Sequence, residues 1–168
     1  LIERGSEVGG GDLRMNVGTM ARVMGARPIS DDRWLVVVVG LERIVVDRWL
    51  PDDPYPLAEV SKFPDEVGSG VNTEEWDALK SLSLQVLASL TELGEIVDGA
   101  KFVLGDEPSM GSFQLGGFGP FSDFDRQRVL SAPGVAGRCA LLTDLLKDVA
   151  AVSKLRLESD EGAGGTRR

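Results

Sequence analysis

The sequence contains one cysteine and no histidine in 168 residues. These two counts exclude a disulfide framework, zinc clusters built on cysteine or histidine, and every catalytic dyad or triad in which a histidine activates the nucleophile. The single thiol, Cys139, falls on the apolar stripe of a predicted helix. In that position we expect a packed side chain rather than a reactive one.

Long apolar runs are also missing. The longest, residues 34–41, is far shorter than the roughly 20 residues that cross a bilayer, and no charged-then-apolar signal region precedes it. Eighteen basic and 27 acidic residues give a net charge of −9, which repels phosphate backbones. We therefore expect a soluble, acidic, cytoplasmic domain with no membrane or nucleic-acid partner. Because the chain begins with Leu1 rather than methionine, we also expect it to start inside a longer gene product.

The first third of the chain has the pattern of antiparallel β structure. Alternating or β-branched runs separated by turn-forming clusters predict four strands, over residues 17–24, 34–39, 44–49 and 55–63. The run from Trp34 to Val39 is apolar throughout, which predicts a strand buried on both faces with Trp34 in the core. A turn is expected over residues 28–32 and a tight connection over residues 40–43.

After Pro64 the hydrophobic period changes from 2 to 3.6. Asn72 followed by Glu75 predicts a helix N-terminus with a capping box. The stripe of this first helix follows at spacings of three and four: Trp76, Leu79, Leu82, Val86, Leu90, Leu93 and Val97. A second, short helix is expected from Ser122 until Pro133-Gly134 stops it, and a third from Val135 to about Leu157.

Two segments of the second half are predicted to lack regular structure. Residues 98–121 hold six glycines and two prolines, which predicts a long loop. Residues 159–168 have little to bury and are expected to be disordered. The predicted fold is thus α+β, with a partly closed antiparallel β lobe over residues 1–64, a helical lobe over 65–158 and a tail over 159–168.

Motifs for catalysis are missing from the sequence. Gly9-Gly10-Gly11 lacks the lysine and helix of a phosphate-binding loop, and Gly116-Gly117-Phe118-Gly119 does not follow a strand as a dinucleotide fingerprint would. The acidic pairs could bind a hard cation or act as acid and base, but each sits where a turn, a loop or a helix N-terminus accounts for it: Asp31-Asp32, Asp52-Asp53, Glu74-Glu75 and Asp106-Glu107. We therefore predict no catalytic residue, no metal site and no cofactor.

Several short motifs, in their order and spacing, resemble one known family. They are Val17-Gly18-Thr19, the strand that runs into Gly40-Leu41-Glu42-Arg43, and Tyr55-Pro56-Leu57-Ala58-Glu59-Val60. In the helical half they are Asp125-Arg126-Gln127-Arg128-Val129-Leu130 and Arg138-Cys139-Ala140-Leu141-Leu142. Together they resemble the amino-terminal domain of Lon-type ATP-dependent proteases over residues 1–157. The chain departs from that family in lacking its opening strands and first helix before Leu1, and in carrying Ile44 where an aromatic residue is usual.

The resemblance implies a six-stranded, partly closed β lobe and a helical lobe with a long helix. It also implies structural roles for four residues. Gly40 lets the chain reverse, and Arg43 pairs with a carboxylate or caps carbonyl groups at the start of the returning strand, since a bare buried cation is costly. Arg138 faces the short helix that carries Asp125. With the opening strands absent, the β lobe is expected to have exposed edges or to be completed by a partner strand.

In Lon proteases this domain recruits protein substrates and helps the oligomer to assemble, whereas the ATPase and the Ser–Lys peptidase lie in other domains. The resemblance therefore implies a non-catalytic module that binds client proteins or unfolded segments. Alternatives are an assembly module that associates with itself, an accessory partner of an ATP-dependent protease, and an enzyme that uses carboxylates.

The predicted loop over residues 98–121 is our candidate client-binding surface. Its large apolar side chains need a partner, either a client or the chain's own core at the seam between the lobes. The acidic residues near it, Asp98, Asp106 and Glu107, favour basic or neutral client segments. The candidate binding residues are Phe113, Leu115, Phe118 and Phe121.

Overall fold

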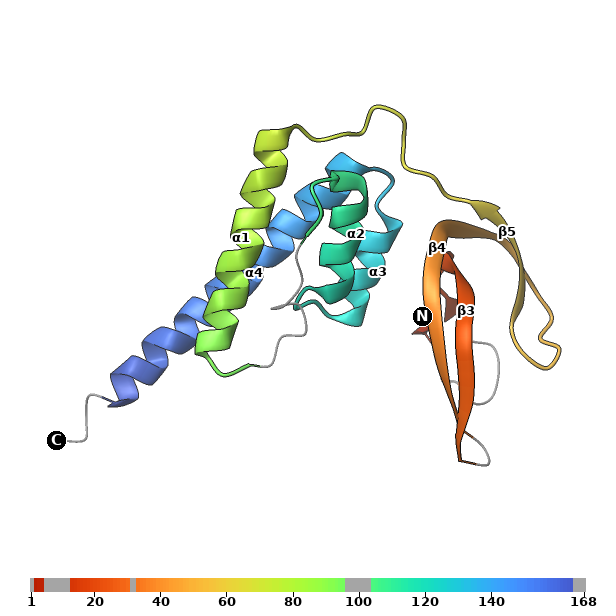
Figure 1. Ribbon diagram of the computed structural model, residues 1–168, viewed down its shortest axis with the longest axis horizontal. Coiled ribbons are helices and arrows are strands. Elements are labelled where there is room, and N and C mark those ends of the chain that lie inside the picture. Colours follow the sequence, from red (N-terminus) through yellow and green to blue (C-terminus); the bar gives the residue numbers. More distant parts are fainter. Residues whose placement is uncertain (1, 5–12, 31–32, 96–103, 165–168) are drawn as a thin grey trace. The chain divides into compact units, whose positions relative to one another are not determined.

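The computed structural model describes residues 2–4, 13–30, 33–95 and 104–164. The chain divides into two compact units, Leu1–Pro64 and Asp65–Arg168, each of which is described in turn. The first unit holds the strands and the second the helices, so the α+β class predicted from the sequence is confirmed (Figure 1). The elements are β1 (Ile2–Arg4), β2 (Leu13–Arg14), β3 (Val17–Ser30), β4 (Arg33–Leu50), β5 (Leu57–Lys62), α1 (Thr73–Glu92), α2 (Pro108–Phe118), α3 (Asp123–Ser131) and α4 (Val135–Gly164).

The sheet of the first unit is antiparallel, with the strand order β3-β4-β5, and β1 and β2 form a separate two-stranded ladder. β4 is shared between its two neighbours: residues 33–45 pair with β3, and residues 44–50 pair with β5. Only Ile44 and Val45 therefore have a strand on both sides. The resemblance implied six strands in a partly closed lobe, whereas the described residues form five strands and an open sheet.

One of the two turns predicted in this unit is wrong, and the other, over residues 28–32, is shorter than predicted, because the antiparallel strands β3 and β4 are joined between Ser30 and Arg33. β3 continues through Pro28, which pairs with Trp34, as far as Ser30, and an edge strand tolerates a proline there because it needs no amide on its outer side. The predicted connection over residues 40–43 lies inside β4. Met20 pairs with Glu42 and Ala21 pairs with Gly40, so Leu41 is the extra residue of a β-bulge. A bulge bends a strand without reversing it, which explains why one long strand replaces the two predicted.

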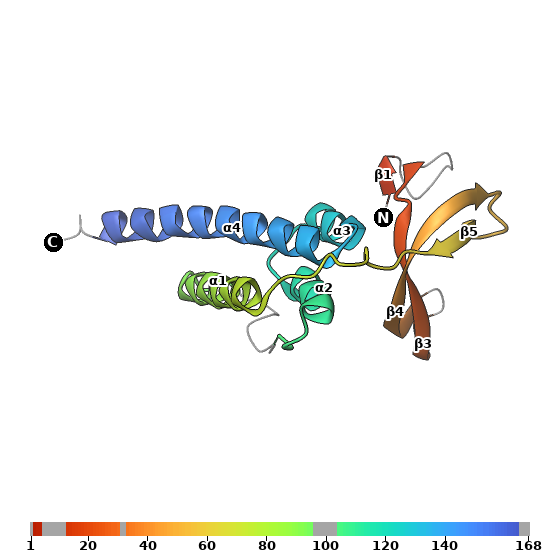
Figure 2. The same ribbon diagram turned by 90° about the horizontal axis from the view of Figure 1, so that it is seen from above.

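The second unit is built around α1 and α4, which lie side by side (Figures 1 and 2). Asn72 and Glu75 form the predicted capping box, since the Asn72 side chain accepts from the Glu75 amide at 2.8 Å and the Glu75 carboxylate accepts from the Asn72 amide at 3.0 Å. α1 ends before Gly94, whose φ of +75° suits glycine. The last residue of the predicted stripe, Val97, lies outside the described residues.

The core of this unit joins side chains from all four helices. Its buried members are Trp76, Leu79, Val86, Leu90, Leu115, Phe121, Val129, Val135, Cys139, Leu142, Leu145 and Leu146. α3 begins after Ser122, which caps it, and ends before Pro133, as predicted. α4 is longer than predicted and continues to Gly164, so the tail expected to be disordered from Ser159 is helical up to that residue.

The loop predicted over residues 98–121 is wrong from Pro108 to Phe118, because that segment is helix α2. Pro108 occupies the first turn, where its missing amide costs nothing. Two of its glycines lie where the helix touches other helices: a Cβ on Gly111 would collide with the Trp76 ring, and one on Gly116 would lie 2.6 Å from Val129 Cγ1. The glycines thus permit close packing of α2.

Candidate protein-binding surfaces

The four candidate binding residues belong to three different environments. Leu115 and Phe121 are buried in the helical core. Phe113 is half-buried, with its ring 3.6 Å from the Arg138 guanidinium carbon. Phe118 is 49% exposed at the end of α2. Buried side chains are not available to a client. Of the four candidates, only Phe118 is therefore exposed as a client-binding residue is expected to be.

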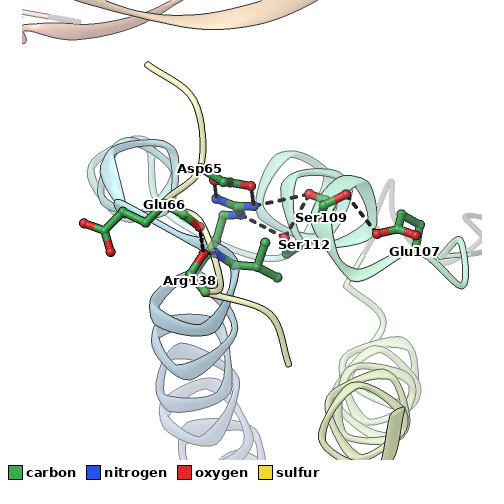
Figure 3. Close-up of polar contacts among 8 residues, drawn as sticks. Asp65, Glu66, Glu107, Ser109, Ser112 and Arg138 are labelled. Atoms are coloured by element: carbon green, nitrogen blue, oxygen red, sulfur yellow. Dashed lines mark hydrogen bonds and ion pairs between the residues drawn. The ribbon is translucent and has the colours of Figure 1, made fainter. Parts of the chain in front are cut away.

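Arg138 is the most fully buried charged residue that the structure describes, with no solvent exposure. Its guanidinium donates to both carboxylate oxygens of Asp65, at 2.8 and 2.9 Å, and Nε donates to Ser112 Oγ at 2.8 Å (Figure 3). It also donates to the Ser109 carbonyl at 3.3 Å, and it stacks on Phe113. These contacts satisfy a buried cation and join α4, α2 and the segment before α1.

The partner of Arg138 differs from the one expected. The resemblance placed Arg138 against the helix that carries Asp125, but the Asp125 carboxylate accepts from Ser122 and Arg128 within its own helix. The segment around Asp65 is instead fixed over the start of α4. There the Val135 amide donates to Ser69 Oγ at 3.1 Å and the Glu66 amide donates to the Pro133 carbonyl at 3.0 Å. The Asp65–Arg138 pair is therefore part of the cap that closes the amino end of α4.

In the β unit, Gly40 and Arg43 flank the bulge. A Cβ on Gly40 would lie 3.1 Å from Thr19 Cγ2 on the neighbouring strand. The Arg43 side chain is buried, and its guanidinium carbon lies 4.4 Å from the centre of the Phe63 ring. A cation over an aromatic face is attracted by the ring's electrons. Arg43 therefore links β4 to the residue that follows β5.

In each of the three acidic pairs that the structure describes, one member forms an ion pair or a helix cap. Asp52 accepts two hydrogen bonds from Arg14, Glu75 completes the capping box, and Asp106 pairs with Lys80. The pair Asp31-Asp32 lies outside the described residues. Among the described residues, no group of three or more acidic or cysteine side chains could hold a metal ion. No described helix has the length and apolarity of a membrane span.

Cys139 is buried on the stripe of α4. Burial raises the pKa of its thiol above the ordinary value, and the neighbouring Arg138 opposes this only in part. A thiol held in its neutral form is a poor nucleophile, because the thiolate is the reactive species. Cys139 thus belongs to the core.

Nine large apolar side chains are exposed on two neighbouring strands of the β unit. Residues 21–30 of β3 and 33–39 of β4, which we call the β3–β4 arm, form a two-stranded ribbon with no third strand among the described residues (Figures 1 and 2). Apolar side chains are exposed on both faces of the arm, and Trp34 is 62% exposed. Its large exposed apolar side chains are Val23, Met24, Ile29, Trp34, Leu35, Val36, Val37, Val38 and Val39.

The prediction of a strand buried on both faces is therefore wrong for residues 34–39. An apolar run shows that a strand tends to be covered, but it cannot show whether the cover is supplied by the same chain. Soluble monomers rarely expose apolar patches of more than a few hundred Å² without a function in binding. The exposed surface of the arm therefore could not be predicted from the apolar run alone.

Two solved structures are similar to this chain. The N-terminal domain of the Lon protease from the Mycobacterium avium complex has the same fold, with a TM-score of 0.56 and 20% identity over 79% of this chain and 70% of that one. The Lon N-terminal domain protein from Xanthomonas campestris gives a TM-score of 0.49 and 21% identity over 77% of this chain and 68% of that one. No curated protein sequence matches the chain.

The fold thus defines an α+β domain of the type found at the amino end of Lon proteases. The family profile of the ATP-dependent protease La (LON) substrate-binding domain matches residues 5–148. The chain belongs to this family, as the resemblance of its motifs implied.

Proposed function

We propose that this chain is a non-catalytic module that binds client proteins through unfolded, apolar segments. The observation that carries the proposal is the exposure of apolar side chains on both faces of the β3–β4 arm. Burying such side chains against a client removes apolar surface from water, which is the main favourable term in protein association. Membership of a substrate-binding family supports the same function.

The backbone of the arm suits an extended client. β3 is an edge strand of the described sheet, and an edge strand can pair with an added strand through its free amides and carbonyls. Between Gly18 and Val23, β3 carries no extra residue, because the bulge at Met20 and Ala21 adds Leu41 to β4; beyond Val23 the register shifts again and Pro28 lacks an amide. An extended segment that lies along residues 18–23, which lead into the arm, therefore gains main-chain hydrogen bonds as well as apolar contacts.

The test measures binding of a permanently unfolded protein, reduced and carboxymethylated α-lactalbumin, to the whole chain without ATP. We expect saturable binding, and none to native α-lactalbumin. Replacing Val36 and Val38, which lie on one face of β4, by threonine should weaken binding by about ten-fold, because two exposed valines no longer bury apolar surface. The matched control is Val67→Thr, the same change at a fully exposed valine outside the arm. Absence of saturable binding by the unaltered chain would overturn the proposal.

Self-association is a second candidate function, because the same arm and the edge of β3 could be covered by another copy of this chain. Light scattering over a range of protein concentrations distinguishes the two. A dimer that dissociates when Val36 and Val38 are replaced by threonine favours assembly. A monomer that still binds the unfolded protein favours client recognition.

A further inference from the structure

The helical unit contains a hollow between α1 and α2 that is separate from the β3–β4 arm. Its volume is about 560 Å³, within the range of roughly 300–1,000 Å³ that is typical of ligand pockets. Leu84 and Leu87 of α1 face Leu115 and Phe118 of α2, with Leu104 contributed by the segment before α2. The hollow therefore has a largely apolar lining that is assembled from both helices.

Two side chains of this lining are exposed although they are large and apolar. Leu84 is 65% exposed and Phe118 is 49% exposed, while Leu115 is buried and forms the floor. An apolar ligand in the hollow would cover Leu84 and Phe118 at once. Burying a leucine or phenylalanine side chain stabilises a complex substantially, so covering the exposed surface of this pair would contribute to binding.

One end of the hollow is charged. Lys80 Nζ lies 2.9 Å from an oxygen of Asp77 and 3.3 Å from an oxygen of Asp106. The hydrogen bond to Asp77 raises the pKa of Lys80, and that to Asp106 acts in the same direction, so the lysine stays protonated. Two carboxylates and one ammonium leave a net charge of −1, and the Asp106 side chain is fully exposed.

We infer that this hollow binds a client segment in which bulky apolar residues are adjacent to lysine or arginine, with the apolar residues between Leu84 and Phe118 and the basic residue beside Asp106. The inference rests on the proposed function and gives it a sequence preference. The negative end distinguishes this ligand from a fatty acid, because the carboxylate of a fatty acid would be repelled by Asp77 and Asp106. It also disfavours acidic client segments.

The test uses three fluorescent peptides that differ in one block of residues, Leu-Phe-Lys-Lys, Leu-Phe-Glu-Glu or Ser-Ser-Lys-Lys, and the whole chain. We expect the first peptide to bind most tightly, by about ten-fold over the serine peptide because the apolar contacts are lost. Its advantage over the glutamate peptide should be about two- to five-fold and should shrink in high salt, because the charged contacts are exposed. Equal binding of all three peptides would overturn the inference.

Matched variants locate the binding in the hollow. Leu84→Ser and Phe118→Ser should each weaken binding of the first peptide by about ten-fold. Leu155→Ser and Phe124→Ser make the same changes at side chains that are 64% and 59% exposed but do not belong to the described lining, and they should leave it unchanged. Asp106→Asn should remove the preference for lysine over glutamate, whereas Asp123→Asn, at another exposed aspartate, should not.

If something other than a client segment occupies the hollow, the same experiments should give different results. If Leu84→Ser and Phe118→Ser lower the melting temperature by several degrees and leave peptide binding intact, the hollow is filled by the chain itself and the inference is wrong. If dodecanoate binds and the peptides do not compete with it, the ligand is a small apolar molecule and the inference is equally wrong. If the chain binds unfolded α-lactalbumin but these variants do not affect the peptides, the hollow is excluded while the proposed function stands. Binding of neither probe overturns both.

Discussion

Asp65 and Arg138 form a two-pronged ion pair across 73 positions of sequence, with N–O distances of 2.8 and 2.9 Å. The arginine has no solvent exposure, and Asp65 keeps about a quarter of its side-chain surface in water. The hydroxyl of Ser112 and the carbonyl of Ser109 accept further hydrogen bonds from the same guanidinium (Figure 3). The pair thus connects the segment after Pro64, helix α2 and helix α4.

Loss of either partner of this pair should destabilise the helical unit strongly. Asp65→Asn leaves a buried guanidinium without its counter-charge, and we expect unfolding free energy to fall by about 3 kcal/mol. Denaturant unfolding followed by helical circular dichroism measures it. The control is Asp123→Asn, which removes an exposed carboxylate 3.9 Å from Arg126 and should cost less than about 1 kcal/mol. Equal losses in the two variants would show that the Asp65–Arg138 pair has no special role.

Substitution by alanine should change the stability of the chain in opposite directions at two glycines of α2. Gly111→Ala places a methyl group against the Trp76 ring and should destabilise the chain by about 1–3 kcal/mol through overpacking. Gly117→Ala, in the same helix, meets nothing within 4 Å and should stabilise it by up to about 1 kcal/mol, because alanine favours helix. Thermal melts of the two variants check this, and a shift of the same sign in both would contradict the packing of α2 on Trp76.

The N-terminal cap of α1 should stabilise the folded chain mainly through one hydrogen-bond acceptor, the side-chain oxygen of Asn72. Asn72→Ala removes the oxygen that accepts from the Glu75 amide and should cost about 1 kcal/mol. Asn72→Asp retains an acceptor next to the helix N-terminus and should be almost neutral. Denaturant unfolding curves of both variants measure the difference. A full loss in Asn72→Asp would mean that the amide group of Asn72, rather than its oxygen, is required.

Cys139 should make stability depend on alkaline pH. Burial raises the pKa of its thiol in the folded chain above the ordinary value, which is about 8.5 in the unfolded chain. The stabilisation is complete below the unfolded pKa and is lost as pH rises toward the folded pKa, because only the unfolded state releases the proton. Unfolding free energies between about pH 8 and 10 should fall more steeply for the unaltered chain than for Cys139→Ala. Parallel curves would rule out this linkage.

The same cysteine reports on opening of the core. Since Cys139 is the single thiol of the chain and is buried, reaction with a thiol reagent such as Ellman's should be slow in the native state and fast in denaturant. Rapid labelling of the native chain at neutral pH would show that α4 does not hold the thiol in the core.

Elements with local signals could be predicted from the sequence. The start of α1 follows from Asn72 and Glu75, three positions apart, which bond to each other's backbone. The limits of α3 follow in the same way from Ser122 and Pro133. The α+β class follows from the change of hydrophobic period after Pro64. Each of these features depends on residues within one or two turns of helix or one strand, so neighbours in sequence carry the information.

Tertiary contacts decided the remaining features. α2 is helical despite its glycines because they pack against Trp76 and Val129, which are distant in sequence. Arg138 was expected to face the helix that carries Asp125, but it pairs with Asp65, because residues 65–69 fold over the start of α4. The valines of β4 are exposed because the described sheet supplies no layer to cover the β3–β4 arm. Hydrophobicity and charge indicate which groups need a partner, but the partner's position depends on how distant segments meet in space.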